Sequence, residues 1–323
     1  MSTKSDILAI LEKNRDRYLS GQELAESLSL SRTAIWKSIK ALETDGHIIN
    51  AVTNKGYVLE ADSDVISPES IRSYLPENLR SLPILVYKTV DSTNTQLKKL
   101  ALDGAEHGTI LVSDEQSAGR GRSGKSFYSP AGTGLYISIL LRPKVCGGDP
   151  QMITIGAAAA ICRAIEELSG MDVQIKWVND IYLNGKKVCG ILTEAVTDFE
   201  SGGIESIVLG AGINCRAPEG GFPEEISDIA CALDVQGLSR SRLVARLVEG
   251  IIQSFEGKEN TEQLLDEYRK RSFLIGKTVS FVKDGAQLTA LVDGIDDKGC
   301  LMVCCEDGRR MALSSGEVSV RRK

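Results

Sequence analysis

The spacing of hydrophobic residues in the first part of the chain predicts three short helices followed by a hairpin. A capping box at residues 20–23 (Ser-Gly-Gln-Glu) marks the start of the second helix, because its hydroxyl and its carboxylate can each accept a backbone amide. A third helix begins at Ser31. Its apolar residues Ile35, Ile39 and Leu42 recur at i, i+4 and i+7, so they form one buried face.

Two strand-like segments, at 47–52 and 57–59, complete this unit with a wing. Three helices and a hairpin in this order are typical of a winged helix-turn-helix, whose second motif helix enters the major groove of DNA. The residues expected to meet base edges are Ser31, Arg32, Thr33, Trp36 and Lys37. Lys40 and Lys55 are better placed for phosphates, which bind without reading sequence. A winged helix that binds another protein is the alternative.

Beyond this unit, strand-like runs alternate with helical stretches. We expect strands at 84–87, 109–113, 135–141, 173–177, 187–195 and 206–213, and helices at 68–74, 94–103, 150–169 and 239–256. Asn184 and Gly185 lie between two of the strands, and both residues tolerate the positive φ of a tight hairpin turn. A hairpin joins antiparallel strands, so the pattern favours a mixed α+β sheet over a doubly wound parallel one.

The pattern changes at two boundaries. A segment rich in Ser, Asp and Pro at 62–68 follows the N-terminal unit. After a helical segment at 261–270, five short strands joined by turns with Asp and Gly suggest a small SH3-like barrel. We therefore expect an α+β multidomain chain with three domains: a winged helix-turn-helix and linker at 1–64, a central mixed α/β-sheet domain at 65–271, and an SH3-like C-terminal β-barrel at 272–323.

The charge of the chain argues against strong DNA binding by a single copy of the N-terminal unit. The net charge of the chain is −6, and residues 1–60 carry five lysines and three arginines against three aspartates and five glutamates, so this unit is neutral. Dimerisation would supply the phosphate contacts that one copy lacks. The N-terminus lacks the zones of a signal peptide, and no apolar run reaches the ~20 residues of a membrane-spanning helix. We expect a cytoplasmic protein that does not bind a membrane.

Eight cysteines are scattered along the chain, at positions 146, 162, 189, 215, 231, 300, 304 and 305. They form no paired C-x-x-C knuckles, and the chain has only two histidines as further ligands. Buried, reduced thiols are therefore expected rather than a zinc site, and the sequence identifies no metal ligands.

A loop rich in glycine and arginine lies between two predicted strands, at residues 116–125 (Gln-Ser-Ala-Gly-Arg-Gly-Arg-Ser-Gly-Lys). Glycines let the backbone approach a ligand, and the cations Arg120, Arg122 and Lys125 lie beside them, which suits a phosphate. The loop is neither a Walker A loop nor a dinucleotide fingerprint. Taken alone, it is equally consistent with a solvated connection.

Four more motifs accompany this loop. They are residues 91–94 (Asp-Ser-Thr-Asn), 176–180 (Lys-Trp-Val-Asn-Asp), 186–192 (Lys-Lys-Val-Cys-Gly-Ile-Leu) and 210–214 (Gly-Ala-Gly-Ile-Asn). Together the five motifs resemble those of the biotin protein ligase family, whose pattern runs DSTN, QxAGRGR, KWPND, KxxGIL and GAGIN. The resemblance spans the whole chain, including the winged helix and SH3-like domain of the bifunctional members, which also act as biotin-responsive repressors.

The resemblance implies a role for each matching residue. The biotin pocket would use Ser92, Thr93, Asn94, Gln116, Arg120, Gly121, Arg122, Lys187, Gly190, Leu192 and Gly212. The ATP site would use Arg122, Lys125, Phe127, Asn179, Lys187 and Asn214, and the catalytic residues would be Arg122, Lys187 and Asp180. Hydroxyl and amide side chains can pair with the ureido ring of biotin. Cations can neutralise the charge that develops when a carboxylate attacks a phosphate.

Most of these residues also have an ordinary structural interpretation. Ser92 or Thr93 can cap the helix that follows. Asn179 and Asp180 can form a turn, and Trp177 suits a hydrophobic core.

The chain departs from the family pattern at three positions. Val178 replaces the proline of KWPND, which should loosen the backbone before Asn179. Phe127 stands where many members carry a tryptophan near the adenine, and it can still stack. Ser123 replaces a frequent arginine. None of these changes removes a residue assigned to the chemistry.

The activity implied is an ATP-dependent biotin protein ligase that forms biotinyl-5′-AMP and transfers biotin to a lysine of a biotin carboxyl carrier protein, with Mg²⁺ expected. The same chain would bind operator DNA as a repressor, as a homodimer when the adenylate is bound. Two alternatives stay open: a repressor that senses a ligand without catalysis, and a ligase for lipoate or octanoate.

Overall fold

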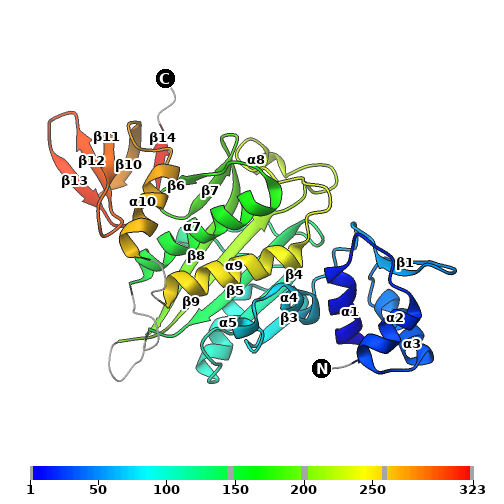
Figure 1. Ribbon diagram of the computed structural model, residues 1–323. Helices are drawn as coiled ribbons and strands as arrows, with labels where there is room; N and C mark the ends of the chain where they lie inside the picture. Colours follow the sequence, from blue (N-terminus) through cyan, green and yellow to red (C-terminus); the bar gives the residue numbers. More distant parts are fainter. Residues whose placement is uncertain (1–2, 144–148, 198–202, 257–259, 321–323) are drawn as a thin grey trace.

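The structure is a computed structural model that describes residues 3–143, 149–197, 203–256 and 260–320. Figure 1 shows three parts in chain order: a helical unit in blue, a central sheet covered by helices, and a smaller sheet in orange and red at the opposite end from the blue unit. This arrangement confirms the predicted α+β multidomain class.

The N-terminal unit contains the three helices and the hairpin that its hydrophobic spacing predicts. They are α1 (Thr3–Lys13), α2 (Gly21–Leu28), α3 (Arg32–Thr44), β1 (Ile49–Val52) and β2 (Gly56–Leu59). The apolar face of α3 is buried in a core shared with α1 and α2. One half of the capping box forms, because Ser20 Oγ accepts the Glu23 N–H, while the Glu23 carboxylate pairs with Arg17 at 2.9 Å.

The central domain is built on a seven-stranded sheet of order β3-β4-β5-β9-β8-β7-β6. Its strands are β3 (Ile84–Val90), β4 (Ile110–Gln116), β5 (Gly134–Leu141), β6 (Gln174–Lys176), β7 (Asp180–Leu183), β8 (Lys186–Thr197) and β9 (Ile204–Asn214). Strands β3 and β4 are parallel and the other neighbours are antiparallel, which confirms a mixed sheet. The predicted hairpin turn at Asn184 and Gly185 joins β7 to β8, and both residues have positive φ.

Helices cover both faces of this sheet. The helices of this domain are α4 (Pro68–Tyr74), α5 (Thr93–Leu102), α7 (Pro150–Ser169), α8 (Glu224–Ser227), α9 (Arg240–Phe255) and α10 (Thr261–Arg271), with short 3₁₀ turns at Glu77–Leu79 and Arg122–Gly124. Every residue of β5 is buried. Its residues alternate between the main core, which contains Ile137 and Ile139, and a smaller core under α5, which contains Leu140. In Figure 1, α7 and α9 run together across one face.

A buried carboxylate fixes the N-terminal unit to the central domain. Glu12 of α1 accepts hydrogen bonds from Ser70 Oγ and from Tyr74 Oη (2.6 Å) of α4, and it pairs with Arg15 at 2.7 Å. Its side chain is 1% exposed, and a buried charge is stable only when it is paired in this way. Burial and the neighbouring Glu12 raise the pKa of Tyr74 to about 12, so the phenol remains a donor at neutral pH.

A second buried ion cluster lies where the linker meets the sheet. Asp64 accepts from the backbone N–H and Nε of Arg240, at 2.8 and 2.7 Å, and pairs with Arg216 at 3.1 Å. Arg240 also donates to Asp114 Oδ1 of β4 at 2.6 Å and to the carbonyl of Gly134 at 3.0 Å. The linker is therefore tied to strands that lead toward the glycine- and arginine-rich loop.

The C-terminal sheet has five antiparallel strands. They are β10 (Thr278–Lys283), β11 (Ala286–Ile295), β12 (Leu301–Cys305), β13 (Arg310–Leu313) and β14 (Val318–Val320). The ladder runs β13-β12-β11-β10-β14, with β13 and β14 at its ends, so the closed barrel stays a prediction. This sheet shares the main core with the central domain, and Trp177 Nε1 donates to the carbonyl of Gly299 at 2.9 Å. The core interpretation of Trp177 is therefore right.

No helix among the described residues is long and apolar enough to cross a membrane. The seven cysteines in the described ranges are free thiols, and Cys146 lies outside those ranges. Cys231, Cys300 and Cys304 are half-buried rather than buried as expected. Burial raises the pKa of Cys215 to about 12, so this thiol stays protonated at neutral pH.

Candidate active site

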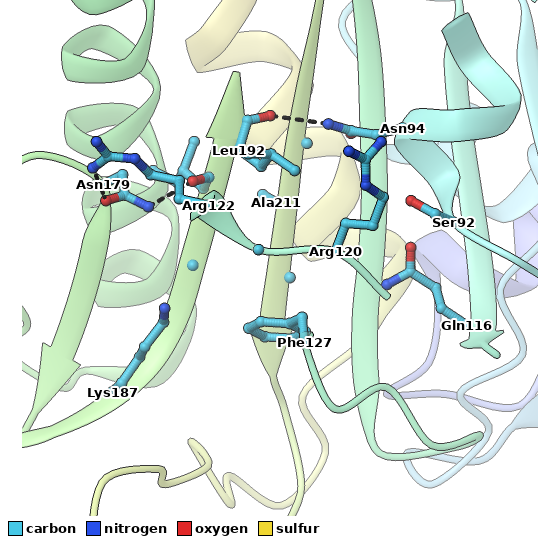
Figure 2. Close-up of a pocket in the computed structure, with 15 residues that line it drawn as sticks. Ser92, Asn94, Gln116, Arg120, Arg122, Phe127, Asn179, Lys187, Leu192 and Ala211 are labelled. Atoms are coloured by element: carbon cyan, nitrogen blue, oxygen red, sulfur yellow. Dashed lines mark hydrogen bonds between the residues drawn. The ribbon is translucent and has the colours of Figure 1, made fainter. Parts of the chain in front are cut away.

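Two adjoining cavities lie between the glycine- and arginine-rich loop and strands β8 and β9. The first, which we call the polar slot, has Ser92, Gln116 and Arg120 at one end and Arg122, Asn179 and Lys187 at the other (Figure 2). The second, which we call the large cavity, has a volume of about 440 Å³ and extends to β6, β7 and the C-terminal sheet. Five residues line both cavities and form the passage between them: Gly121, Arg122, Phe127, Asn179 and Lys187.

Ser92 lines the polar slot instead of capping a helix. It is the N-cap residue of α5, yet its side chain makes no cap hydrogen bond. The turn is held by Asp91, whose Oδ1 accepts from the Ser92 N–H at 2.6 Å and from Gln96 Nε2 at 2.7 Å. The capping interpretation is therefore wrong for Ser92, and its hydroxyl is available to a ligand.

Thr93 lies behind the slot and orients Gln116. The Gln116 Oε1 accepts from the backbone N–H of Thr93 at 2.9 Å and from its hydroxyl at 3.2 Å. Gln116 Nε2 has a second hydrogen besides the one donated to Ser129 Oγ at 2.9 Å. The structure thus brings Gln116 to the slot and places Thr93 behind it, and the predicted contact of Thr93 with a ligand stays a prediction.

The loop itself is a tight turn. The Gly121 N–H donates to the carbonyl of Lys125 at 2.7 Å, and Arg120 and Ser126 form an antiparallel bridge. A Cβ at Gly119 would lie 2.4 Å from the carbonyl oxygen of Phe127, so only glycine fits there. The loop is largely exposed to solvent, but its backbone is held by hydrogen bonds at the turn and by close packing at Gly119.

Each cation of the loop contacts a different element. The partners are Glu194 of β8 for Arg120 (3.3 Å), Asn179 for Arg122 (2.9 Å) and Glu317 beside β14 for Lys125 (2.6 Å). Hydrogen bonding to Lys125 lowers the pKa of Glu317. Because the partner of Arg122 is a neutral amide, the charge of this guanidinium remains available to an anionic ligand.

Hydrogen bonds hold the segment around Asn179 in place. Asn179 Nδ2 donates to the carbonyl of Ile191 at 2.7 Å, and Tyr268 Oη donates to the buried carbonyl of Val178 at 2.8 Å. The peptide bond between Trp177 and Val178 is cis. Hydrogen bonds with two other elements hold this backbone, and the expectation that Val178 loosens it stays a prediction.

Lys187 points into the passage from the start of β8. Its Nζ lies 2.7 Å from Asp180 Oδ1 and 6.0 Å from the centroid of the Phe127 ring. Backbone hydrogen bonds with Ile229 and Cys231 fix the position of this residue. Lys187 is therefore not a solvated strand residue, and an anion in the passage can compete with Asp180 for its ammonium group.

The ring of Phe127 separates the polar slot from the large cavity. A Cβ at Gly212 would lie 2.5 Å from the ring, and one at Gly190 would lie 3.4 Å from it. Tyr136 packs edge-on against the same ring at 6.4 Å between centroids. Both glycines line the slot, as predicted for the walls of a ligand pocket. Gly212 makes room for Phe127, whereas a Cβ at Gly190 would come closest to the Lys187 side chain, at 3.0 Å. Phe127 in turn supplies a flat face to both cavities.

The large cavity combines cations with aromatic and aliphatic walls. Lys125, Asn179, Asp180 and Asn214, which the sequence singled out, all line it. Lys176, quoted only as the first residue of a motif, lines it as well. The sequence did not single out several further lining residues, namely Tyr128, Tyr182, Phe222 and Ile226. Burial lowers the pKa of Lys176 and raises the pKa of Tyr182 to about 12. Such a cavity suits a flat ring with an anionic tail.

A metal site built by the protein alone is not found in the described ranges, where no three His, Cys, Asp or Glu side chains cluster. Mg²⁺ commonly binds through one or two carboxylates together with substrate phosphates. Asp180, which lines the large cavity and pairs with Lys187, fits that arrangement, with the remaining ligands coming from a phosphate-bearing substrate and water.

The outer face of α3 carries the residues expected to meet DNA. Those predicted to contact bases are all exposed, namely Ser31, Arg32, Thr33, Trp36 and Lys37. Ser31 Oγ accepts the Ala34 N–H at 3.2 Å and so caps α3. Of the two lysines predicted to meet phosphates, Lys40 pairs with Glu43 at 2.6 Å, and Lys55 lies over the ring of Tyr18.

Three segments of the chain match models of known families. Residues 3–58 match an HTH domain, residues 86–214 match the biotin/lipoate A/B protein ligase family, and residues 274–321 match the biotin protein ligase C-terminal domain. These segments coincide with the winged unit, the strands that carry the two cavities, and the C-terminal sheet.

Several proteins are similar to this chain along nearly its whole length. The bifunctional ligase/repressor BirA of Bacillus subtilis is 31% identical over 319 residues, which is 97% of each chain. The protein of the same name from Escherichia coli is 29% identical over 94% of this chain and 92% of its own. A biotin protein ligase from Aquifex aeolicus, solved in complex with biotin and ATP, aligns with a TM-score of 0.64 at 29% identity and covers 75% of this chain and 99% of that one.

Proposed function

The chain belongs to the family of the bifunctional ligase/repressor BirA, and we propose that it attaches biotin to a lysine of a biotin carboxyl carrier protein in two steps. In the first, a carboxylate oxygen of biotin attacks the α-phosphorus of ATP, the bond to the β-phosphate breaks and pyrophosphate leaves. In the second, the ε-amine of the carrier lysine attacks the acyl carbon of biotinyl-5′-AMP. AMP leaves, and the new amide forms with the loss of one proton.

One observation carries this proposal: two cavities of different character meet at a passage lined by Arg122 and Lys187. We assign biotin to the polar slot and ATP to the large cavity. The carboxylate and the α-phosphate then meet at the passage, where two anions must approach each other. Positioned cations stabilise the charge that develops there, and this stabilisation is the main way in which a protein can accelerate such a reaction.

The polar end of the slot fits the ureido ring of biotin. That ring has one carbonyl acceptor and two N–H donors, and the slot offers the hydroxyl of Ser92 and the amide of Gln116. Phe127 lies between the slot and the large cavity, where it can stack on the adenine of ATP.

Asp180 is assigned to the second step. It pairs with Lys187 in the free protein, so an anion that draws Lys187 away leaves the carboxylate free to orient the incoming amine. Mg²⁺, when bound with ATP, supplies further neutralisation of the phosphate charge.

The test is a mass measurement on a carrier domain incubated with the protein, biotin and ATP. A mass increase of one biotinyl group, dependent on both substrates, is the expected result. An unmodified carrier together with tight biotin binding would instead support a sensor without catalysis. Replacing biotin with lipoate or octanoate distinguishes a biotin ligase from a ligase for these acids. A plain alkyl chain cannot use the hydrogen-bonding groups of Ser92 and Gln116.

We also propose that the chain represses transcription in the cytoplasm as a biotin-responsive homodimer. The exposed residues of α3 support DNA binding, and adenylate formation would favour the dimer. The three domains would be 1–64, 65–271 and 272–323.

The experiment that tests repression is selection of bound duplexes from a random library, with and without biotin and ATP. Enrichment of a palindromic site only with both substrates is expected, and enrichment independent of them would contradict the proposal.

A further inference from the structure

Glu194 of β8 lies just beyond the motif at 186–192 and contacts three side chains around the polar end of the slot. Its Oε1 lies 2.8 Å from Lys98 Nζ and 3.3 Å from Arg120 Nη1. Its Oε2 accepts a hydrogen bond from Asn94 Nδ2 at 2.9 Å. The Glu194 side chain is 18% exposed. One carboxylate therefore connects α5, β8 and the glycine- and arginine-rich loop.

The first consequence concerns Asn94, whose amide is fully used by the protein. Its Nδ2 donates to Glu194 and also to the carbonyl of Leu192 at 3.1 Å, and its Oδ1 lies 2.6 Å from Ser138 Oγ. A Cβ at Gly210 would lie 2.1 Å from that Oδ1, so the amide is packed against the strand. Asn94 is thereby held as a fixed wall of the slot, and Glu194 is one of the two acceptors that orient its Nδ2.

The second consequence concerns Arg120. Its side chain is 47% exposed and rises from the loop beside Asn94, as Figure 2 shows. A long exposed side chain samples many rotamers unless a partner holds it. Glu194 is that partner, so the ion pair places the Arg120 side chain along the slot.

The third consequence is the distribution of charge. Lys98 and Arg120 bring two positive charges to the polar end, and Glu194 offsets one of them. Burial alone would raise the pKa of Glu194, but hydrogen bonds from Lys98 and Asn94 lower it below its usual range, so the carboxylate is charged at neutral pH. Without this charge, the polar end would compete with Arg122 and Lys187 for the carboxylate of the substrate.

We propose that Glu194 is a positioning residue for biotin, which holds Asn94 and Arg120 in place at the ureido end of the slot and offsets the positive charge there. The proposal rests on the assignment of biotin to the polar slot. It goes further by making the affinity for biotin depend on a residue that acts through its neighbours.

The test is the substitution Glu194→Gln, which keeps the shape of the side chain and removes its charge. We expect the Kd for biotin, measured by calorimetry, and the KM for biotin to rise about tenfold, because charge-assisted hydrogen bonds to Arg120 and Lys98 are lost. The kcat and the KM for ATP should stay within about twofold of the wild type, since a positioning role at the ureido end is uniform in the ground and transition states.

Two further variants sharpen this test. Arg120→Gln should raise the Kd for biotin in the same way, and the double variant should be no worse than Arg120→Gln alone if Glu194 acts through Arg120. The matched control is Glu205→Gln on β9, because Glu205 pairs with Arg142 at the same distance of 3.3 Å, but Arg142, unlike Arg120, lines neither cavity. This control should leave the Kd for biotin unchanged.

The outcomes are distinguishable. An unchanged Kd for biotin in Glu194→Gln, in a protein whose melting temperature matches the wild type, overturns the inference. Equal weakening in Glu205→Gln does so as well. If Glu194→Gln does not fold, an unchanged Kd in Arg120→Gln overturns it instead. A wild-type chain that binds no biotin at all would refute the proposed function itself.

Discussion

The polar slot and the outer face of α3 both gather polar side chains, yet they hold them in different ways. In and around the slot, each cation of the loop has a partner from another element, and Asn94 uses its whole amide within the protein. On α3, Arg32, Trp36 and Lys37 extend from the exposed face of the helix, and Trp36 is 52% exposed.

This difference has an energetic meaning. Side chains that are already held in place lose little freedom when a ligand binds, whereas each mobile side chain costs about 0.5–1.5 kcal/mol to immobilise. The side chains around the slot are therefore held in place before a ligand arrives, although the slot has a volume of only about 40 Å³ and must widen to admit biotin. The exposed side chains of α3 lose more freedom when they are immobilised. Single substitutions should cost more in the first region than in the second.

The largest effect is expected for Lys187→Ala at the passage. Loss of a cation that stabilises developing charge should lower the rate of adenylate formation by about 10³-fold, with folding and ligand-free DNA affinity intact. Biotin-dependent exchange of labelled pyrophosphate into ATP measures this step.

The matched control is Lys186→Ala, because the ammonium of this neighbour donates to the carbonyl of Ser227 at 2.8 Å and does not line the passage. Near-normal exchange in Lys187→Ala, or an equal loss in both variants, would count against the catalytic assignment.

A smaller effect is expected at the buried ion cluster where the linker after the winged unit meets the central sheet. Asp64→Asn removes a charge that pairs with the buried Arg240, and Arg240 keeps Asp114 as its other partner. Breaking a buried pair costs about 3–5 kcal/mol, and the remaining partner should reduce this to about 2 kcal/mol of unfolding free energy. Urea denaturation measures the change. Asp307→Asn, at an exposed ion pair with Arg309, is the control and should have almost no effect.

Much of the fold was predictable because its elements obey local rules. The face of α3 follows from the spacing of Ile35, Ile39 and Leu42, and the hairpin after β7 follows from Asn184 and Gly185. Strand β7 itself was missed, because its two buried residues make too short a hydrophobic run between two turns. Closure of the C-terminal sheet depends on contacts between distant strands, which no local pattern specifies.

The site was predictable only as far as it lies in motifs. Residues of the motifs line both cavities, but Glu194, Tyr182 and Glu317 were missed. Glu194 and Glu317 meet the loop only through tertiary contacts, and a lone glutamate in a strand carries no signal of such a partner. Thr93 shows the converse, since this motif residue does not line the slot but donates to Gln116, which does.

A further prediction tests how tightly the passage is packed. A methyl group at Gly212 would meet the ring of Phe127, so Gly212→Ala should displace the ring and raise the KM for ATP about tenfold, in line with the usual cost of overpacking. Steady-state kinetics give the value. Gly294→Ala in β11 is the matched control, because a Cβ there meets nothing within 4 Å. Equal effects in both variants would show that the loss is a general one and not a property of the passage.

The smallest effect is expected on DNA binding by the winged unit, where Lys40 is paired with a carboxylate and Lys55 is exposed. Lys55 is exposed at the tip of the wing, while the ammonium of Lys40 is paired with Glu43 at 2.6 Å and must leave that partner to reach a phosphate. Lys55→Ala should weaken binding to a random duplex about threefold and reduce the slope of log affinity against log salt by about one unit. Lys40→Ala should change the slope less, because Glu43 already offsets its charge. Fluorescence anisotropy over a salt series measures both slopes. A larger change for Lys40 than for Lys55 would mean that the pairing seen in the free protein does not govern how this face meets DNA.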